Sequence, residues 1–460
     1  MMKRIFFFIC ILSSLLSCYD DDSFTTDPSA RLTFSTDTVR MDTVFTTIGS
    51  STYSFWAFNY SGDGIRISRV FLRKGSQNGF RVNVDGSFLD NSIGSSVSDL
   101  EVRKGDSIRV FVELTAPVNM QDVAQKIEDD LVFQLESGVE QDMHLTSYAW
   151  DAQLLRNPVI QNDTVIESTR PILIYGQLKV NEGVTLTIKN TTLFFHDKAG
   201  MSIYGTLLTD SVLMRGDRLD HMFDYLPYDR VSGQWGGLRF YESSTGNILI
   251  NTVIRSGTNA VRCDSSQLSP DNQRLYMERC VVHNSMGYGV QLRNSYVSLV
   301  DCQVSNSEGD CVSIYGGAVN LSGCTIAQFY PFVANRGVAL RFTNALNGYQ
   351  YPLELLDCRN SIITGYADDE IMGTQADEDA NFNYWFENSL LRTPKIDDEE
   401  HFKDIIWETP ADIIQGKLHF VNIDETNFIY DFHLVKASPA QGLGCYRQSD
   451  SDESPSENDE

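Results

Sequence analysis

A 22-residue repeat in the middle of the chain is the feature that most constrains the fold of this sequence. Cys280, Cys302 and Cys324 lie 22 residues apart, and each is followed two positions later by a branched aliphatic residue. Alternate residues of a strand face the same side, so positions that recur in this way form columns pointing into a common interior. The apolar residues that recur with the cysteines are Leu275/Met277, Val297/Leu299 and Val319/Leu321 before them, and Val282, Val304 and Ile326 after them.

Each repeat also carries a polar corner and a closing apolar pair. An amide side chain, Asn284, Asn306 or Gln328, lies four residues after each cysteine. Short strands, bends and polar corners at a period in the low twenties predict a parallel β-helix, in which like residues stack on like residues. In three successive coils we align the closing pairs Val290/Leu292, Val312/Ile314 and Val338/Leu340.

The segments around these repeats resemble right-handed parallel β-helix proteins of the pectate-lyase-like superfamily. The stretch "ILIYGQLKVNEGVTLTIKNTTLFF" at 172–195 is similar to their opening coils, and "QWGGLRF" at 234–240 is similar to a later coil. The ending "YDFHLVKASPAQGLG" at 430–444 resembles the end of such helices. The resemblance spans about 157–444 and implies the fold, but it implies no single activity, because lyases, hydrolases, adhesins and binding proteins share this fold.

The segment before the repeats has a different pattern of polar and apolar residues. Between residues 31 and 150, short runs of alternating polar and apolar residues are separated by turn-forming stretches such as "SGDG" and "KGSQNG". This pattern predicts an antiparallel β-sandwich of Ig-like size. It resembles the Ig-like modules that follow the anchor in many surface lipoproteins, although no cysteine lies between Cys18 and Cys263 to form an inter-sheet disulfide.

The first 22 residues predict export and a lipid anchor. Lys3 and Arg4 precede an apolar run at 5–16, which is too short to cross a bilayer and is typical of a secretory signal. The run ends in "LLSC", which resembles a bacterial lipobox and implies lipidation of Cys18. The acidic residues at 20–22 resemble the export tag of surface lipoproteins of Bacteroidota type. An ordinary cleaved signal peptide with a chance cysteine is the alternative.

These features predict an all-β protein anchored in the outer membrane and exposed at the cell surface. The predicted segments are a signal peptide at 1–17, an acidic linker at 18–30, an Ig-like β-sandwich at 31–150, a right-handed parallel β-helix at 151–445 and a disordered acidic tail at 446–460.

Composition excludes some partners. The formal net charge of −26 opposes the basic surface that nucleic acids require, so we expect no nucleic-acid partner. Seven cysteines remain after Cys10 and Cys18, an odd number that cannot form a complete disulfide framework within one chain. No cysteine or histidine spacing is typical of a metal site, so we expect no cofactor. Calcium is the alternative, although no ladder of aspartates supports it.

One strand of each coil exposes a polar row that we predict to be a ligand groove. Guanidinium groups pair well with carboxylates, and aromatic rings stack on sugars, so this row favours an acidic polysaccharide or another surface ligand. The alternative is that any outward strand face is polar. The candidate residues are Arg262, Asp264, Arg293, Tyr315 and Arg341 along the strand, with Asp310 and Arg336 at its entrance.

Asp310 lies in "EGDCVSIYGG" at 308–317, which resembles the catalytic segment of polygalacturonase-like hydrolases. Those enzymes need paired carboxylates, whereas the neighbouring coils here, "MGYGVQL" and "NRGVALRF", supply no acid at the matching position. In our alignment Tyr288 and Arg336 flank Asp310. We therefore expect Asp310 to contact a ligand and not to form half of an acid pair.

The sequence thus favours a non-catalytic module for glycan binding or adhesion, built on a β-helix. The alternative is a polysaccharide lyase or glycoside hydrolase that acts on an acidic polysaccharide, with catalytic residues that no motif identifies.

Overall fold

In the computed structural model, the described residues are 23–90, 92, 94–269 and 272–447. The predicted lipidation site Cys18 and nearly all of the acidic tail lie outside them. The chain divides between Asp151 and Ala152 into two compact units, which are described separately. Within the described part of the chain, no helix is both long and apolar enough to cross a membrane.

The first unit is built from two β-sheets. One sheet has the order β1 (Phe24–Thr25), β6 (Gly64–Leu72), β11 (Gln125–Leu135), β12 (Glu140–Trp150) and β3 (Thr38–Arg40), with β9 (Ser96–Val102) beside β6 and β4 (Val44–Phe45) beside β12. The other has the order β2 (Thr33–Phe34), β5 (Tyr53–Phe58), β10 (Ser107–Leu114), β7 (Phe80–Val84) and β8 (Ser87–Phe88). A 3₁₀ turn, η1 (Gly75–Asn78), precedes β7.

The two sheets share one apolar core. Their strands alternate buried and exposed residues, as a strand with one face against a core must. Phe55 from the second sheet meets Phe133 from the first, with ring centroids 6.3 Å apart. The unit is therefore a β-sandwich, as the alternating pattern predicts.

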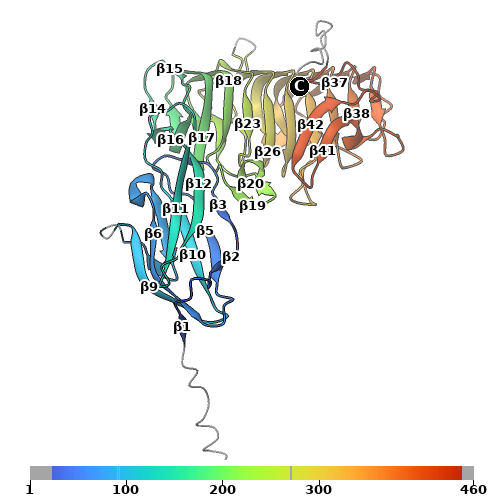
Figure 1. Ribbon diagram of the computed structural model, residues 1–460. Coiled ribbons are helices and arrows are strands. Elements are labelled where there is room, and N and C mark those ends of the chain that lie inside the picture. The colour runs from blue at the N-terminus through green and yellow to red at the C-terminus, as the bar shows by residue number, and fades with distance from the viewer. Residues whose placement is uncertain (1–22, 91, 93, 270–271, 448–460) are drawn as a thin grey trace, which may run out of the picture. The chain divides into compact units, whose positions relative to one another are not determined.

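The second unit is a parallel β-helix whose strands belong to one 24-stranded sheet that winds through successive coils (Figure 1). Each coil has three faces. The first face contains β13 (Gln153–Arg156), the start of β16 (Ile172–Val180), β23 (Val253–Arg255), β26 (Val281–Ser285), β28 (Gln303–Ser307), β30 (Thr325–Gln328), β35 (Ile362–Gly365), β38 (Leu390–Arg392) and β40 (Ile406–Glu408).

The second face contains β14 (Val159–Ile160), β21 (Gly237–Phe240), β24 (Val261–Cys263), the starts of β27 (Val290–Val300) and β29 (Val312–Ser322), β31 (Leu340–Thr343) and β36 (Ile371–Thr374). The third contains β15 (Thr164–Glu167), β22 (Asn247–Ile250), β25 (Leu275–Glu278), the ends of β27 and β29, β34 (Leu353–Arg359), β37 (Phe382–Glu387) and β39 (Phe402–Lys403). Near the start of the helix, β17 (Thr185–Ile203) and β18 (Thr206–Gly216) each run along more than one face.

The cysteine columns lie inside the helix, as the repeat predicts. Cys280, Cys302 and Cys324 are at most 1% exposed, and their coils pair in register through Val281, Gln303 and Thr325. All seven cysteines of the described chain have free thiols. The interior is one continuous apolar cluster, so each coil is stabilised by burial against its neighbours.

The corner before this column requires an unusual backbone conformation. Asn251, Arg279, Asp301, Gly323 and Asn360 occupy it in successive coils, with φ values from 48° to 62°. Asparagine, aspartate and glycine tolerate this left-handed region better than other residues, because a short polar side chain or no side chain reduces the steric penalty. The corner therefore explains the recurrence of asparagine, aspartate and glycine at four of these five positions, with Arg279 as the exception.

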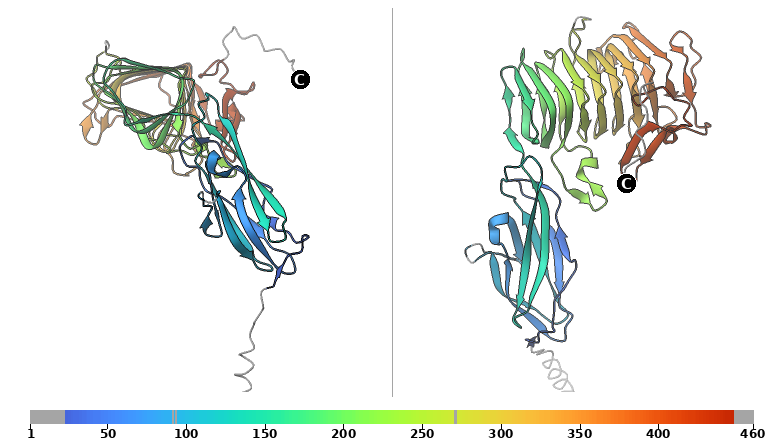
Figure 2. Two further views of the ribbon diagram at one scale, coloured as in Figure 1. Left: turned by 60° about the vertical axis from the view of Figure 1, so that its left-hand side comes forward. Right: turned by 45° about the horizontal axis from the view of Figure 1, so that its top comes forward.

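Two appendages project from the same side of the β-helix (Figure 2). The first is an insertion between β18 and β21, which contains β19 (His221–Phe223), β20 (Leu226–Pro227) and η3 (Tyr228–Arg230). The second is the C-terminal hairpin of β41 (Phe420–Asp424) and β42 (Ile429–Leu434), preceded by η4 (Gly416–His419). The hairpin packs on the first face through Phe420 and Phe432. A small hairpin, β32 (Ala345–Leu346) and β33 (Tyr349–Gln350), follows β31.

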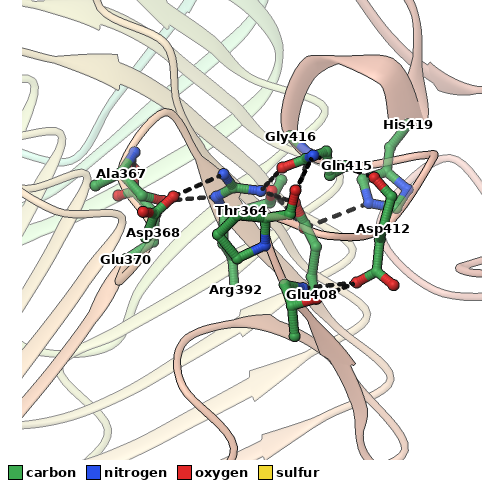
Figure 3. A network of polar contacts seen from close by, with 12 residues as sticks. Thr364, Ala367, Asp368, Glu370, Arg392, Glu408, Asp412, Gln415, Gly416 and His419 are labelled. Atoms are coloured by element: carbon green, nitrogen blue, oxygen red, sulfur yellow. Dashed lines mark hydrogen bonds and ion pairs between the residues drawn. The ribbon is translucent and has the colours of Figure 1, made fainter.

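A buried network of charged side chains closes the last coils (Figure 3). Glu408 is bound by the guanidinium of Arg392 and by the backbone N–H of Gly416, and it accepts a hydrogen bond of 2.7 Å from Thr364. Arg392 also donates from Nε to the carbonyl of Ala367, at 2.6 Å.

Candidate functional site: an arginine-rich face

The second face of the β-helix carries a row of arginine side chains, which we call the arginine face. The strands behind it pair without interruption, so Arg239 lies beside Arg262, and Ser313 lies beside Arg341. Neighbouring strands are about 4.8 Å apart, so a chain lying along the helix axis meets one coil after another. The arginine face is defined by Arg239, Arg262, Asp264, Arg293, Tyr315 and Arg341.

Asp264 holds two of these arginines. Its Oδ2 lies 2.8 Å from Nη2 of Arg239, and its Oδ1 lies 3.1 Å from Nε of Arg262. The arginines keep 42% and 29% of their side-chain surface accessible. One carboxylate therefore orients two guanidinium groups that are still open to an anionic ligand.

Asp310 is buried and fully bonded, with 5% of its side chain exposed. Its Oδ2 accepts hydrogen bonds from Nε of Arg341 at 2.8 Å and from the Ser313 hydroxyl at 3.0 Å. Its Oδ1 accepts one from the Val338 N–H at 3.0 Å. The hydrogen bond to Asp310 raises the pKa of Arg341. Asp310 therefore positions Arg341, whose side chain is 34% exposed, and the surface that meets a ligand is that of Arg341.

Arg293 and Tyr315 lie side by side at the centre of the face. Arg293 Nη2 is 3.5 Å from Oε1 of Gln291, and its buried Nε has no hydrogen-bond partner among the described residues. Burial, together with the nearby Tyr288 and Asp310, raises the pKa of Tyr315 to about 12. The Tyr315 hydroxyl is therefore protonated at neutral pH and can donate a hydrogen bond.

Arg336 is not brought into this row. Its Nη1 donates to the carbonyls of Tyr330 and Val333, both at 2.9 Å, and its guanidinium lies 4.3 Å from the ring centre of Tyr366. The alignment of this coil was wrong by two residues, because Val312 pairs with Leu340 and not with Val338. Arg336 thus holds the loop between β30 and β31, and it is not a register neighbour of Asp310.

The arginine face offers no opposed pair of carboxylates. Asp264 and Asp310 are offset by roughly 16 Å along the strand direction, at 3.3 Å per residue, and by about 10 Å more across two coils at about 4.8 Å each. Glycoside hydrolases place their two carboxyl groups about 5 to 9.5 Å apart. Both aspartates are also engaged by arginines. Among the residues that the structure describes, no group of three or more His, Cys, Asp or Glu side chains is arranged to hold a metal ion.

Two members of this neighbourhood were missed from the sequence. Arg239 lies in "QWGGLRF", a segment that we used only as a sign of the fold, although the alternation that exposes Arg262 also exposes Arg239. Tyr288 was aligned with Asp310 but was not predicted to meet Tyr315. That contact crosses between coils and between register columns, so alternation within one strand does not reveal it.

Comparison with known proteins identifies the fold of part of this unit. A family model described as the right handed beta helix region matches residues 157–326. No curated protein matches the chain.

The similar solved structures resemble the chain only weakly. The ASH/PapD-like domain of human CEP192 is 10% identical, with a TM-score of 0.19, and the match covers 28% of this chain and 92% of that one. A family 123 glycoside hydrolase from Clostridium perfringens is 6% identical, with a TM-score of 0.17 and 26% of each chain covered. The catalytic domain of a GH87 α-1,3-glucanase is 10% identical, with a TM-score of 0.18, and 79% of this chain and 85% of that one are covered.

Proposed function

We propose that this protein is a cell-surface lipoprotein that binds an acidic polysaccharide along the arginine face without cleaving it. The β-helix provides the binding surface, and the N-terminal sandwich acts as an Ig-like module between the lipid anchor and this surface. The polysaccharide lies along the helix axis, so that its carboxylate or sulfate groups meet successive coils.

One observation carries the proposal. In a chain with a net charge of −26, the arginine face gathers four arginines against two carboxylates, Asp264 and the buried Asp310, which leaves a formal charge of +2 (4 − 2). A concentrated positive surface on an acidic protein favours binding of an anionic ligand at that surface. The negative charge elsewhere on the protein disfavours nonspecific contacts with the same ligand. The planar guanidinium group binds carboxylate and sulfate through paired hydrogen bonds.

The engagement of Asp264 and Asp310 by arginines favours binding over hydrolysis. A general base must accept a proton, whereas each of these carboxylates is already bonded to guanidinium N–H groups. A polysaccharide lyase or glycoside hydrolase that acts on an acidic polysaccharide is the enzymatic alternative, and the product analysis at the end of the Discussion tests it.

We expect Arg293→Ala to weaken binding of an acidic polysaccharide about tenfold, because it removes a charge-assisted contact from the centre of the face. The measurement is affinity electrophoresis of the full-length protein through gels that contain polygalacturonate or, for comparison, neutral dextran. Retardation by polygalacturonate should also decrease as the salt concentration rises.

Arg359→Ala is the matched control for this prediction. Arg359 is an exposed arginine of the same β-helix, but it lies on the third face and is paired with Asp357 at 2.7 Å. Its removal should leave binding unchanged. Equal losses for the two variants would show that the polysaccharide responds to overall charge and not to the arginine face.

The membrane anchor is tested at Cys18. We expect wild-type cells to incorporate labelled palmitate into the protein, and Cys18→Ala to abolish the label and release the protein from the outer-membrane fraction, because a diacylated cysteine is the anchor. A Cys18→Ala protein that stays in the membrane fraction, together with an unlabelled wild type, would contradict the lipoprotein assignment.

A further inference from the structure

A pocket lies on the first face of the β-helix, away from the arginine face. It has a volume of about 370 Å³ and lies between the coils, the insertion before β21 and the C-terminal hairpin. Figure 2 shows both appendages on this side of the helix. Arg230 from η3 donates to the carbonyl of Asn427 at the hairpin tip, at 2.7 Å, so the two appendages meet beside the pocket. This volume is at the small end of the usual range for ligand sites, roughly 300 to 1,000 Å³.

The pocket lining contains two arginines, Arg230 and Arg255, and one carboxylate, Asp229. Asp229 Oδ2 lies 3.2 Å from Nη2 of Arg255 and 3.5 Å from Nη1 of Arg215, so one carboxylate is shared by two guanidinium groups. Arg255 Nε is buried and has no hydrogen-bond partner within the described residues. Burial lowers the pKa of Arg215 to about 10, so Arg215 is still protonated at neutral pH. The Arg255 side chain is 32% exposed, so part of its guanidinium group is open to an anion in the pocket.

The rest of the lining combines neutral polar groups with aromatic rings. His283 Nδ1 bonds to the Ser305 hydroxyl at 2.8 Å, and burial lowers the pKa of His283 to about 4, so the ring is neutral at physiological pH. Phe332 and Phe428 stack with ring centroids 5.1 Å apart. Tyr430 contributes a third ring. Aromatic walls with a few fixed polar groups are typical of sites that hold a sugar ring.

The backbone at Phe428 supports a role for its ring. Phe428 has a φ of 56°, a conformation that is strained for a bulky residue. Strain of this kind persists only where the surrounding structure requires it. Here the strained turn of the hairpin directs the Phe428 ring against Phe332 at the pocket wall.

We propose that this pocket binds a single acidic sugar unit, with its carboxylate or sulfate group on Arg255 and its ring against Phe428 and Phe332. The site is separate from the arginine face and does not rest on the function proposed for it. The sugar can be free or can be the end of a polysaccharide chain, since both present the same chemistry to Arg255.

The test is titration of the full-length protein, purified in detergent, with D-galacturonate, D-glucose 6-sulfate, D-galactose and D-glucose, followed by calorimetry and saturation-transfer NMR. At least one acidic sugar should bind about tenfold more tightly than its neutral parent. A second experiment uses polygalacturonate of defined chain length. If an excess of free galacturonate displaces the ends of these chains from the protein, the free sugar and the chain end share one site.

Two variants locate the site. Arg255→Ala should weaken binding of the acidic sugar about tenfold or more, whereas Arg359→Ala on the third face should leave it unchanged. Arg262→Ala reports any binding of the sugar at the arginine face. Phe428→Gly should also weaken binding several-fold, yet keep or raise the unfolding temperature, because glycine relieves the left-handed strain. This second variant remains informative even if Arg255→Ala fails to fold.

Three outcomes would each overturn the proposal. The first is equal affinity for neutral and acidic sugars, and the second is that none of the four sugars binds. The third is a loss of sugar binding with Arg262→Ala but not with Arg255→Ala. The last outcome would assign the sugar to the arginine face and support the function proposed there. Conversely, loss of monosaccharide binding in Arg255→Ala with unchanged polysaccharide binding would establish two independent sites.

Discussion

Cys302→Asp should lower the free energy of unfolding by several kcal/mol. The Cys302 side chain is fully buried, and its thiol points toward the carbonyl of Val300, with Sγ and the oxygen 3.2 Å apart. Aspartate would place acceptor oxygens against this carbonyl in a column flanked by Cys280 and Cys324, with no cation to balance the charge. Urea unfolding of the two proteins at neutral pH measures the difference.

Cys302→Ser is the matched control, because the same column already accepts hydroxyl groups. Thr252 precedes Cys280 in the ladder, and Ser361 follows Cys324, each with its hydroxyl bonded to a nearby backbone carbonyl at 2.8 Å. The serine variant should therefore lose about 1 kcal/mol or less. If Cys302→Asp and Cys302→Ser melt at the same temperature as the wild type, the inward register of the coil is wrong.

Arg392→Leu is expected to destabilise the protein by about 3 to 5 kcal/mol, because it leaves a buried carboxylate without its main partner. Glu408 exposes 1% of its side chain and Arg392 exposes 6%. Without Arg392, Glu408 retains Thr364 at 2.7 Å, the Gly416 N–H, and His419, whose Nε2 lies 3.3 Å away. These contacts do not replace a guanidinium charge.

The double variant Arg392→Leu/Glu408→Leu separates loss of the ion pair from loss of packing. Replacing both members of a buried pair by apolar residues is often close to neutral, so the double variant should recover most of the stability. Thermal and urea unfolding of the single and double variants are the measurements. A double variant as unstable as Arg392→Leu would show that the network acts through shape and not through charge balance.

The same network predicts a dependence of stability on pH. Burial alone raises the pKa of Glu408, but His419, whose Nε2 lies 3.3 Å away, and hydrogen bonds from Gly416 and Thr364 outweigh it and hold this pKa below its ordinary value of 4.5. A carboxylate with a lowered pKa in the folded state contributes stability above its unfolded pKa, and this contribution is lost as the pH falls through the folded pKa. The stabilising contribution of Glu408 should therefore be complete at neutral pH and disappear in acid.

The repeat made the β-helix predictable from the sequence. Columns of cysteine, valine and leucine recur because each coil buries the same positions. The 22-residue spacing shows these columns in the sequence alone. The sandwich was predictable for a similar reason, since alternation in β10 and β12 reflects one buried face. The short strands at its edges, such as β1 and β4, carry too few residues to show a period.

The sites were less predictable because their contacts cross between coils and loops. The sequence placed Arg262, Arg293 and Arg341 on one outward face, but it gave no sign that Asp310 is buried under Arg341. The coil with Arg336 has a longer corner, and a corner of unknown length shifts every later residue of its coil. The pocket at Arg255 was not foreseen, since its walls come from segments nearly two hundred residues apart.

The most direct test of binding without cleavage is calorimetric titration of the full-length protein with a galacturonate oligosaccharide, followed by mass spectrometry of the recovered ligand. We predict saturable binding that is weakened by Arg293→Ala, and an oligosaccharide recovered with its original mass. Shorter or unsaturated products from the wild type, absent with Arg293→Ala, would contradict the proposed function and identify the arginine face as the active site of a lyase or hydrolase.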